Sequence, residues 1–494
     1  MSVLPKGTSH SRRLFLGGAA ATVGLLALRR IRSVAAQPPA QASPEDRKRI
    51  EEAIPAKALV TPHKPRRLLI FDLNVGYGGH GSIAAANTAF TLMGAKTGAF
   101  ETTISRDPAV FEAESLKQFD AVFFNNTVGN CFEDPALRRN LVEFVYSGGG
   151  LMGVHGTSVA FTKWPGAIED WPEFGIMIGA RGANHRAPDE HVFIKLDDPT
   201  HPVNQVFGGQ GFDYRDEFFR VHEPYSRDRV RVLLSIDTEK TDLQQGPGYG
   251  KLERADNDFA LAWVRGYGRG RVFYCGFAHN PYIFWDPKML QFYLAATQFA
   301  LGDLPGPTTP SAKLTPAVRA QEQLGWRLNL VAAEPGESTF FETIDKASEL
   351  GMLYVGGNNR QKISRDILRE FDDRLTTEEM QQIRLKLDDA GVRLLTYHVD
   401  AMPSDSAGQL KIHKFAWKMG VEAVVAPGTR IALEGRLPEI VNLDKHARVK
   451  GIDWFLDETR RQEQGPAIFC VESGDDELER TIETFNKAVA KPTL

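Results

Sequence analysis

The stretch SGGGLMGVHGTS, from Ser147 to Ser158, decides how the first half of the chain is interpreted. Its apolar part, Leu151 to Val154, has the length of a buried strand, with three glycines before it and a His-Gly pair after it. A strand, a sharp turn with one reactive side chain and then a small residue is the arrangement of a nucleophile elbow. Such a turn raises its side chain above the carboxyl edge of a parallel sheet, where open α/β sheets bind ligands. The stretch therefore predicts a ligand site around the imidazole of His155.

The segments around this stretch alternate between strand and helix patterns. Apolar runs of strand length are followed by helical patterns, and the expected strands and helices before the elbow cover residues 67–74, 83–93, 100–104, 121–126 and 134–146. Further strands are expected at 191–196, 229–236, 259–264 and 271–276, with a helix at 287–302. This alternation favours an α/β fold with a doubly wound parallel sheet. The glycine-rich run 76–82 lacks the spacing of a dinucleotide or phosphate loop, so no nucleotide cofactor is expected.

Length and composition bound the kind of protein. The chain has 494 residues, which is too long for one ordinary core and predicts two domains. The formal net charge is -4, and no basic stripe with interleaved aromatic residues is present, so no nucleic-acid partner is expected. The three cysteines, Cys131, Cys275 and Cys470, form no CxxC pair and are expected to be buried thiols.

The N-terminus resembles a twin-arginine export signal. The run Ser11 to Leu16 contains Arg12-Arg13, an apolar stretch follows to Leu28, and Ser33 to Ala36 offers small residues for cleavage. The resemblance implies a signal peptide over residues 1–36, a periplasmic or secreted protein, and no stable membrane insertion after cleavage. A retained N-terminal anchor stays open as the alternative. Residues 37–65 are polar and rich in Pro and Ala, which is typical of a linker, with one short helix at 44–53.

Several short motifs together resemble the trehalose-utilisation (ThuA-like) family. They are Gly148 to His155, His201-Pro202, Asp216-Glu217, Ala262-Trp263 and Gly268 to Tyr274 with His279. The resemblance covers about residues 67–304 and sets a first domain at 66–304. It implies a fold similar to class I glutamine amidotransferases and a small-molecule carbohydrate as partner. In that wider fold the elbow carries a catalytic cysteine, so His155 excludes thiolate chemistry at this position.

Polar side chains from separate loops are expected to converge on His155. Histidines and a carboxylate that meet in space can hold a divalent metal such as Zn²⁺ with an open position, and the candidate ligands are His155, His185, His279 and Glu217. The rival is metal-free acid–base catalysis by His155 or His279 with Glu217 orienting the base, so the candidate catalytic residues are the same three. A polar network in a non-catalytic sugar-binding cleft is the third alternative. The candidate substrate contacts are His80, Trp164, Asn184 and Asp216.

The second half of the chain follows a linker at 305–324 that is rich in proline. Residues 325–494 repeat βα units, which is typical of a TIM-type barrel. The stretch that begins Phe341-Glu342-Thr343-Ile344 resembles the sugar phosphate isomerase/epimerase (xylose isomerase-like) family, in which His398 and Glu472 match ligand positions. A full barrel needs about 250 residues, and Ala426-Pro427-Gly428 stands where that family has an acidic ligand. We therefore expect a truncated barrel, either a degenerate sugar-binding module or a remaining isomerase.

These features predict an exported carbohydrate-utilisation protein. It is expected to be an enzyme that acts on a sugar or sugar derivative, trehalose-like or another glycoside, as an isomerase, epimerase or hydrolase. The alternative is a non-catalytic carbohydrate-binding or accessory protein with a degenerate barrel. A homo-oligomer is expected in either case.

Overall fold

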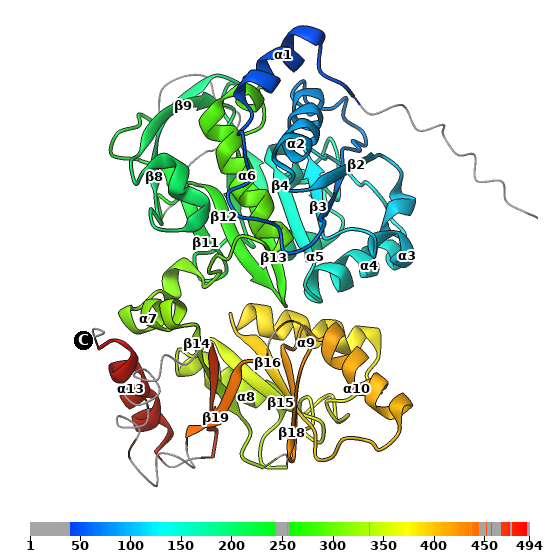
Figure 1. Cartoon of the computed structure of the whole chain (residues 1–494), viewed down its shortest axis with the longest axis vertical. Helices are drawn as coiled ribbons and strands as arrows, with labels where there is room; N and C mark the ends of the chain where they lie inside the picture. Colours follow the sequence, from blue (N-terminus) through cyan, green and yellow to red (C-terminus); the bar gives the residue numbers. More distant parts are fainter. Residues whose placement is uncertain are drawn as a thin grey trace, which may run out of the picture. The chain divides into compact units, whose positions relative to one another are not determined.

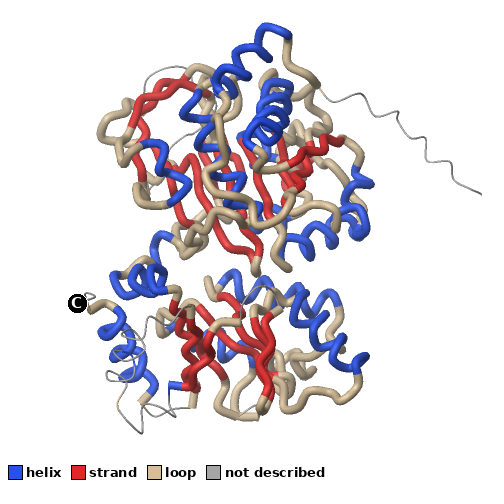
Figure 2. Tube along the Cα trace, in the orientation of Figure 1, coloured by secondary structure: helices blue, strands red, loops and turns tan. Residues whose placement is uncertain are grey.

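Two α/β sheets contain most of the regular structure of the computed structural model (Figures 1 and 2). The structure describes residues 40–243, 254, 256–334, 336–433, 435, 437–443, 451, 456, 466–474 and 477–491, and residues Pro38–Leu494 form one compact unit. The expected export signal, residues 1–36, lies outside the described residues. Within the described ranges, no helix is both long enough and apolar enough to span a membrane.

The first sheet has nine strands in the order β2-β1-β3-β4-β13-β12-β11-β8-β9. Its parallel half contains β2 (Glu101–Ser105), β1 (Arg67–Phe71), β3 (Ala121–Asn125), β4 (Gly150–Val154) and β13 (Gly270–Cys275). Its antiparallel half contains β12 (Ala260–Tyr267), β11 (Arg231–Ile236), β8 (Glu190–Leu196) and β9 (Phe212–Asp216). The sheet is therefore mixed, and its doubly wound parallel character holds from β2 to β13. The hairpin between β12 and β13 reverses the chain and begins the antiparallel half.

Helices cover both faces of the parallel half. One face packs against α1 (Pro44–Ala53), α2 (Ile83–Thr97) and α6 (Pro287–Leu301), and the other packs against α4 (Pro135–Tyr146) and α5 (Pro172–Ile178). Side chains of β1 alternate between these layers: Leu68 and Ile70 belong to the first core, and Leu69 and Phe71 belong to the second. A strand buried on both faces reads as a continuous apolar run, which is why the sequence located it. Such packing leaves only the strand ends free to form a site.

Shorter elements complete this part of the chain. They are α3 (Ala113–Leu116), β5 (Thr162–Lys163), β6 (Ile168–Glu169), β7 (Arg181–Asn184), β10 (Arg220–His222) and the 3₁₀ turns η1 (Pro108–Phe111), η2 (His155–Val159), η3 (Pro202–Phe207), η4 (Pro281–Trp285) and η5 (Ser311–Lys313). The three cysteines are buried thiols that form no disulfide, as the sequence predicted.

The second sheet is an open half-barrel of seven strands in the order β18-β17-β16-β15-β14-β20-β19. The strands are β14 (Trp326–Val331), β15 (Tyr354–Asn358), β16 (Arg393–His398), β17 (Ala423–Ala426), β18 (Thr429–Ala432), β19 (Glu439–Asn442) and β20 (Ala467–Glu472). All neighbours are parallel except β17 and β18. The helices α8 (Phe340–Glu349), α9 (Thr377–Asp389), α10 (Ser406–Lys418) and α13 (Leu478–Val489) share one core with one face of this sheet.

The segment predicted to be a linker at 305–324 contains a helix, α7 (Pro316–Leu324). Thr315 caps it, because its side chain accepts a hydrogen bond from the backbone N–H of Val318, and Pro316 occupies the first turn. Both features are helix-start signals. The proline content that suggested an irregular linker therefore also marks the beginning of a helix.

His201 is a buried structural histidine, and both of its ring nitrogens are used. Its Nδ1 accepts the backbone N–H of Val203 at 3.2 Å, and its Nε2 donates to the carbonyl of Pro307 at 3.2 Å. Only the neutral ring can accept at Nδ1, and burial lowers the pKa of His201 to about 4. An unfolded histidine has a pKa of about 6.5.

The neutral His201 predicts a pH-dependent contribution to folding. Below pH 6.5 the unfolded chain takes up a proton at this histidine and the folded chain does not, so the contribution is complete above pH 6.5 and is lost as the pH falls toward 4. We expect the stability of wild type relative to His201→Asn to fall by roughly 3 kcal/mol at most over this range. Urea unfolding of both proteins between pH 4 and pH 7 measures it. His222→Asn, at an exposed position, is the control, and parallel profiles for wild type and His201→Asn would contradict the prediction.

Candidate active site

His155 is the first residue after β4 and has a strained backbone. Its φ is +39°, a region that non-glycine residues rarely adopt. Hydrogen bonds fix the turn: Gly156 N–H donates to Asn126 Oδ1 at 3.1 Å, and the hydroxyl of Tyr274 donates to the carbonyl of His155 at 2.9 Å. The stretch Ser147 to Ser158 therefore forms an elbow, and the elbow places the imidazole of His155 at the carboxyl edge of the sheet.

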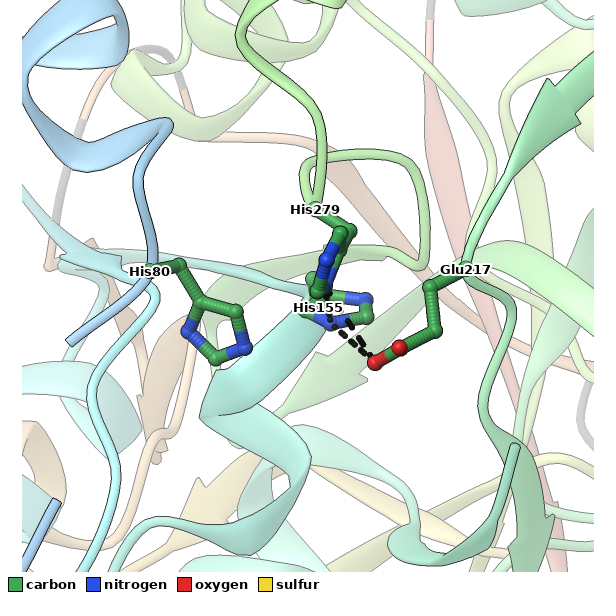
Figure 3. A group of neighbouring side chains, drawn as sticks. All are labelled: His80, His155, Glu217 and His279. Carbon is green, nitrogen blue, oxygen red and sulfur yellow. Dashed lines mark hydrogen bonds and ion pairs between the residues drawn. The ribbon is translucent and has the colours of Figure 1, made fainter. Parts of the chain in front are cut away.

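Three other side chains meet His155 at this edge (Figure 3). His80 lies just before α2, Glu217 follows β9, and His279 lies in the loop after β13, so four distant segments supply the cluster. One ligand atom from each of these residues lies within 4.8 Å of the others. We call His80, His155, Glu217 and His279 the His155 cluster.

Three of these atoms are especially close. His155 Nε2 lies 3.3 Å from His279 Nδ1 and 3.4 Å from Glu217 Oε1, and His279 Nδ1 lies 3.2 Å from the same oxygen. Two ligands bound tetrahedrally to zinc at 2.0–2.1 Å are about 3.3–3.4 Å apart. The triangle of atoms therefore has the dimensions of one face of a zinc coordination tetrahedron.

The tautomer of His155 strengthens this fit. Its Nδ1 lies 3.2 Å from the carbonyl oxygen of Gly276, and a carbonyl can only accept, so Nδ1 carries the proton. In the neutral ring Nε2 then presents a lone pair to the centre of the cluster. A ligating histidine that donates its other ring N–H to a backbone carbonyl is the usual outer-shell arrangement of a metal site.

Burial favours the neutral form of His155 and of His80. Desolvation lowers the pKa of His155, against the opposing effect of Glu217, and desolvation with the nearby imidazoles lowers the pKa of His80 to about 2. The Nδ1 atom of His80 is buried and has no hydrogen-bond partner. Gly156 makes room for this ring, because a Cβ at that position would lie 2.8 Å from His80 Cε1.

Glu217 is the ionised member of the cluster. Burial raises its pKa, but hydrogen bonds from His155, His185 and His279 outweigh burial and hold the pKa far below its usual range. His185 lies on the outer side, with Nδ1 3.2 Å from Glu217 Oε2 and 2.9 Å from the carbonyl of Arg186. Desolvation lowers the pKa of His185, but the hydrogen bonds to Glu217 and to the Arg186 carbonyl, with the charge of Glu217, together raise it above its ordinary value. The His155 cluster thus contains His80, while His185, a predicted ligand, contacts the second oxygen of Glu217.

Asp216 anchors the loop that carries His279. Its buried carboxylate accepts the backbone N–H groups of Ala278, His279 and Asn280 at 3.0, 3.2 and 3.0 Å. Burial raises its pKa to about 7. The sequence predicted a substrate contact here, and the described contacts of Asp216 position the backbone of the His279 loop.

Two aromatic rings, those of Tyr77 and Phe219, lie beside members of the cluster, and Trp164 packs against Tyr77. The ring of Tyr77 lies 5.0 Å from that of His80 and 5.6 Å from that of Trp164, and the ring of Phe219 lies 4.8 Å from that of His155. Trp164 was predicted as a substrate contact. Tyr77 and Phe219 were not, although Tyr77 stands in the glycine-rich run and Phe219 lies two residues after Glu217. Asn184, the other predicted contact, ends β7 and pairs with Arg220 of β10.

Comparison with known proteins finds that the first part of the chain is similar to ThuA-like proteins. Residues 67–300 match the family model described as trehalose utilisation. A ThuA-like protein from Bacteroides uniformis is 21% identical, with 49% of this chain and 93% of that chain covered and a TM-score of 0.40. A ThuA-like protein from Parabacteroides merdae is 17% identical, with 48% and 91% covered and a TM-score of 0.34.

A cytoplasmic protein from Salmonella typhimurium LT2 is 13% identical, with 48% of this chain and 99% of that chain covered and a TM-score of 0.32. The search of curated proteins found no match.

The geometry predicts that the protein binds one divalent metal ion at the His155 cluster. Protein purified without chelator and loaded with Zn²⁺ is expected to hold about one ion per chain. His155→Ala and Glu217→Gln each remove one of the three closest ligand atoms and are expected to bind at least tenfold more weakly. Elemental analysis after dialysis measures the metal content. His222→Ala, which changes an exposed histidine, should retain the ion, and equal loading of all four proteins would disprove a metal centre at the cluster.

Proposed function

We propose that the His155 cluster is a metal-assisted catalytic site for a small carbohydrate. The observation that carries the proposal is the meeting of His155 Nε2, His279 Nδ1 and Glu217 Oε1 at 3.2–3.4 Å. His155 Nε2 and the Glu217 oxygen are both acceptors and repel one another, and a cation bound by them and by His279 Nδ1 removes the repulsion. Three protein ligands are also the usual number in catalytic zinc sites.

Residues next to the three closest side chains hold them in position. His185 holds the second oxygen of Glu217, and Asp216 holds the loop of His279. His80 remains neutral within the cluster, so it can accept a hydrogen bond from a substrate hydroxyl. When bound, a divalent ion polarises a hydroxyl or carbonyl oxygen and lowers the pKa of water to about 7.

The carbohydrate class rests on two observations. Residues 67–300 match the family model described as trehalose utilisation. The rings of Tyr77 and Phe219 lie beside His80 and His155, and Trp164 packs against Tyr77. Aromatic rings offer flat apolar surfaces beside hydrogen-bonding groups, and a sugar has both kinds of surface. We infer that the substrate is a sugar or glycoside that undergoes hydrolysis, isomerisation or epimerisation.

Metal-free acid–base catalysis is less well supported. That alternative needs a proton among the three closest atoms, either on Nδ1 of a neutral His279 or on Nε2 of a charged His155. Desolvation lowers the pKa of His155 and disfavours this charge. Its hydrogen bond to Gly276 already uses the one proton of the neutral ring.

The proposed activity predicts conversion that depends on Glu217. Zinc-loaded protein incubated with trehalose, other disaccharides and their component monosaccharides is expected to convert at least one of them, with products followed by NMR. Glu217→Gln is expected to reduce the rate about 10²-fold or more, because it removes the charge that holds the cluster together. His222→Ala is the matched control. Binding of a sugar without conversion by the wild-type protein would favour the non-catalytic alternative.

We also propose that the protein is exported through the twin-arginine pathway. The support is the sequence from Ser11 to Ala36, with its arginine pair, its short apolar run and its small residues. Replacement of Arg12 and Arg13 by lysine is expected to leave the full chain in the cytoplasm, while the parent reaches the periplasm. Cell fractionation measures this, and export of the double variant at the parent level would contradict the proposal.

A further inference from the structure

A large cavity lies apart from the His155 cluster. It has a volume of about 1190 Å³ within the unit Pro38–Leu494, and no member of the His155 cluster lines it. Besides the exposed Arg319, its lining contains six buried or half-buried arginines: Arg229, Arg231, Arg265, Arg327, Arg384 and Arg393. Such a volume exceeds that of a single ion and suits an organic molecule.

Most of these arginines are neutralised by carboxylates. Arg231 contacts Asp198 at 2.7 Å and Glu322 at 2.8 Å. Arg229 and Arg265 share Asp388, and Arg327 and Arg393 share Glu422. These pairs build the wall of the cavity and leave little net charge on their own side chains.

Arg384 is the exception. Arg384 lies in α9 and is only 3% exposed. No carboxylate of the described residues lies within 4.0 Å of its guanidinium, and the nearby Asp388 pairs with Arg229 and Arg265. The Nε of Arg384 donates to the carbonyl of Met380 at 3.3 Å, its charge lies 5.3 Å from the ring centroid of Tyr146, and its Nη1 has no hydrogen-bond partner. A buried cation without a compensating anion is unfavourable.

Two further buried donor atoms, on residues that line this cavity, also lack acceptors. They are Nε of Arg393 and Nε1 of Trp326, and Trp326 is 2% exposed. The buried acceptor atoms without partners in the described part of the chain belong to residues that do not line the cavity. The cavity therefore has an excess of donors, which a ligand rich in acceptor oxygens would satisfy.

We propose that this cavity binds a small organic anion whose carboxylate or phosphate group contacts Arg384. A guanidinium offers two parallel N–H donors that match the oxygens of either group. The anion neutralises the buried charge of Arg384 and accepts from the neighbouring donors. The site is separate from the proposed catalytic centre, so its occupancy does not depend on the carbohydrate chemistry.

Binding of defined anions to the full chain tests the proposal. Thermal melting and isothermal titration calorimetry at constant ionic strength, with sodium chloride as reference, use three probes: inorganic phosphate, succinate and glucose 6-phosphate. We expect at least one probe to raise the melting temperature and to bind with measurable heat. Binding of phosphate and glucose 6-phosphate but not of succinate identifies a phosphate site. Binding of succinate alone identifies a carboxylate site.

Substitutions at two arginines of the same cavity separate binding from folding. Arg384→Met is expected to melt at or above the wild-type temperature without anion, because it removes an unpaired buried charge, and to bind the anion at least tenfold more weakly. Arg384→Lys keeps the charge without the paired donors and covers the case in which the methionine variant does not fold. Arg319→Met changes an exposed arginine of the cavity lining and should bind as wild type does. Unchanged affinity in both Arg384 variants, or no binding of any probe to wild type, would overturn the proposal.

Discussion

Two imidazole nitrogens and one carboxylate oxygen meet at the carboxyl edge of the first sheet, 3.2–3.4 Å apart, and the surrounding structure holds them there. Two of these atoms, His155 Nε2 and Glu217 Oε1, are acceptors, and a cation bound between them would remove their repulsion. Each of these side chains is held by a further contact. The carbonyl of Gly276 holds the ring of His155, and His185 contacts the second oxygen of Glu217. Asp216 accepts the backbone N–H of His279. The protein thus keeps acceptors close together at a cost in stability, which is the usual sign of a functional site.

The parallel half of the sheet explains how this is possible. Side chains of β1, β3, β4 and β13 are buried between two helical layers, so the strands themselves are rigid. The positive φ of His155 and the tight approach of Gly156 to His80 are local strains that such a framework can support. The antiparallel strand β9 then brings Glu217 to the same edge from the other half of the sheet.

The sequence located most of the regular elements because buried parallel strands are continuous apolar runs between turn residues. It also identified His155, His279 and Glu217 as neighbours, since polar residues after parallel strands collect at one edge. It did not distinguish His80 from His185 as the fourth member of the ligand group. Which of the two histidines joins the cluster depends on how the loops direct their side chains, and the sequence pattern contains no information about that direction. The helix α7 was hidden in a proline-rich segment, and the donors around Arg384 come from positions distant in sequence, so nothing local marked them.

The most direct test is X-ray absorption spectroscopy at the zinc edge on the metal-loaded protein. We expect the zinc ion to have nitrogen and oxygen neighbours at about 2.0–2.1 Å, with the outer-shell scattering of at least two imidazole rings and no sulfur neighbour. Six oxygen neighbours without imidazole scattering, or no retained metal, would contradict a metal centre at His155, Glu217 and His279.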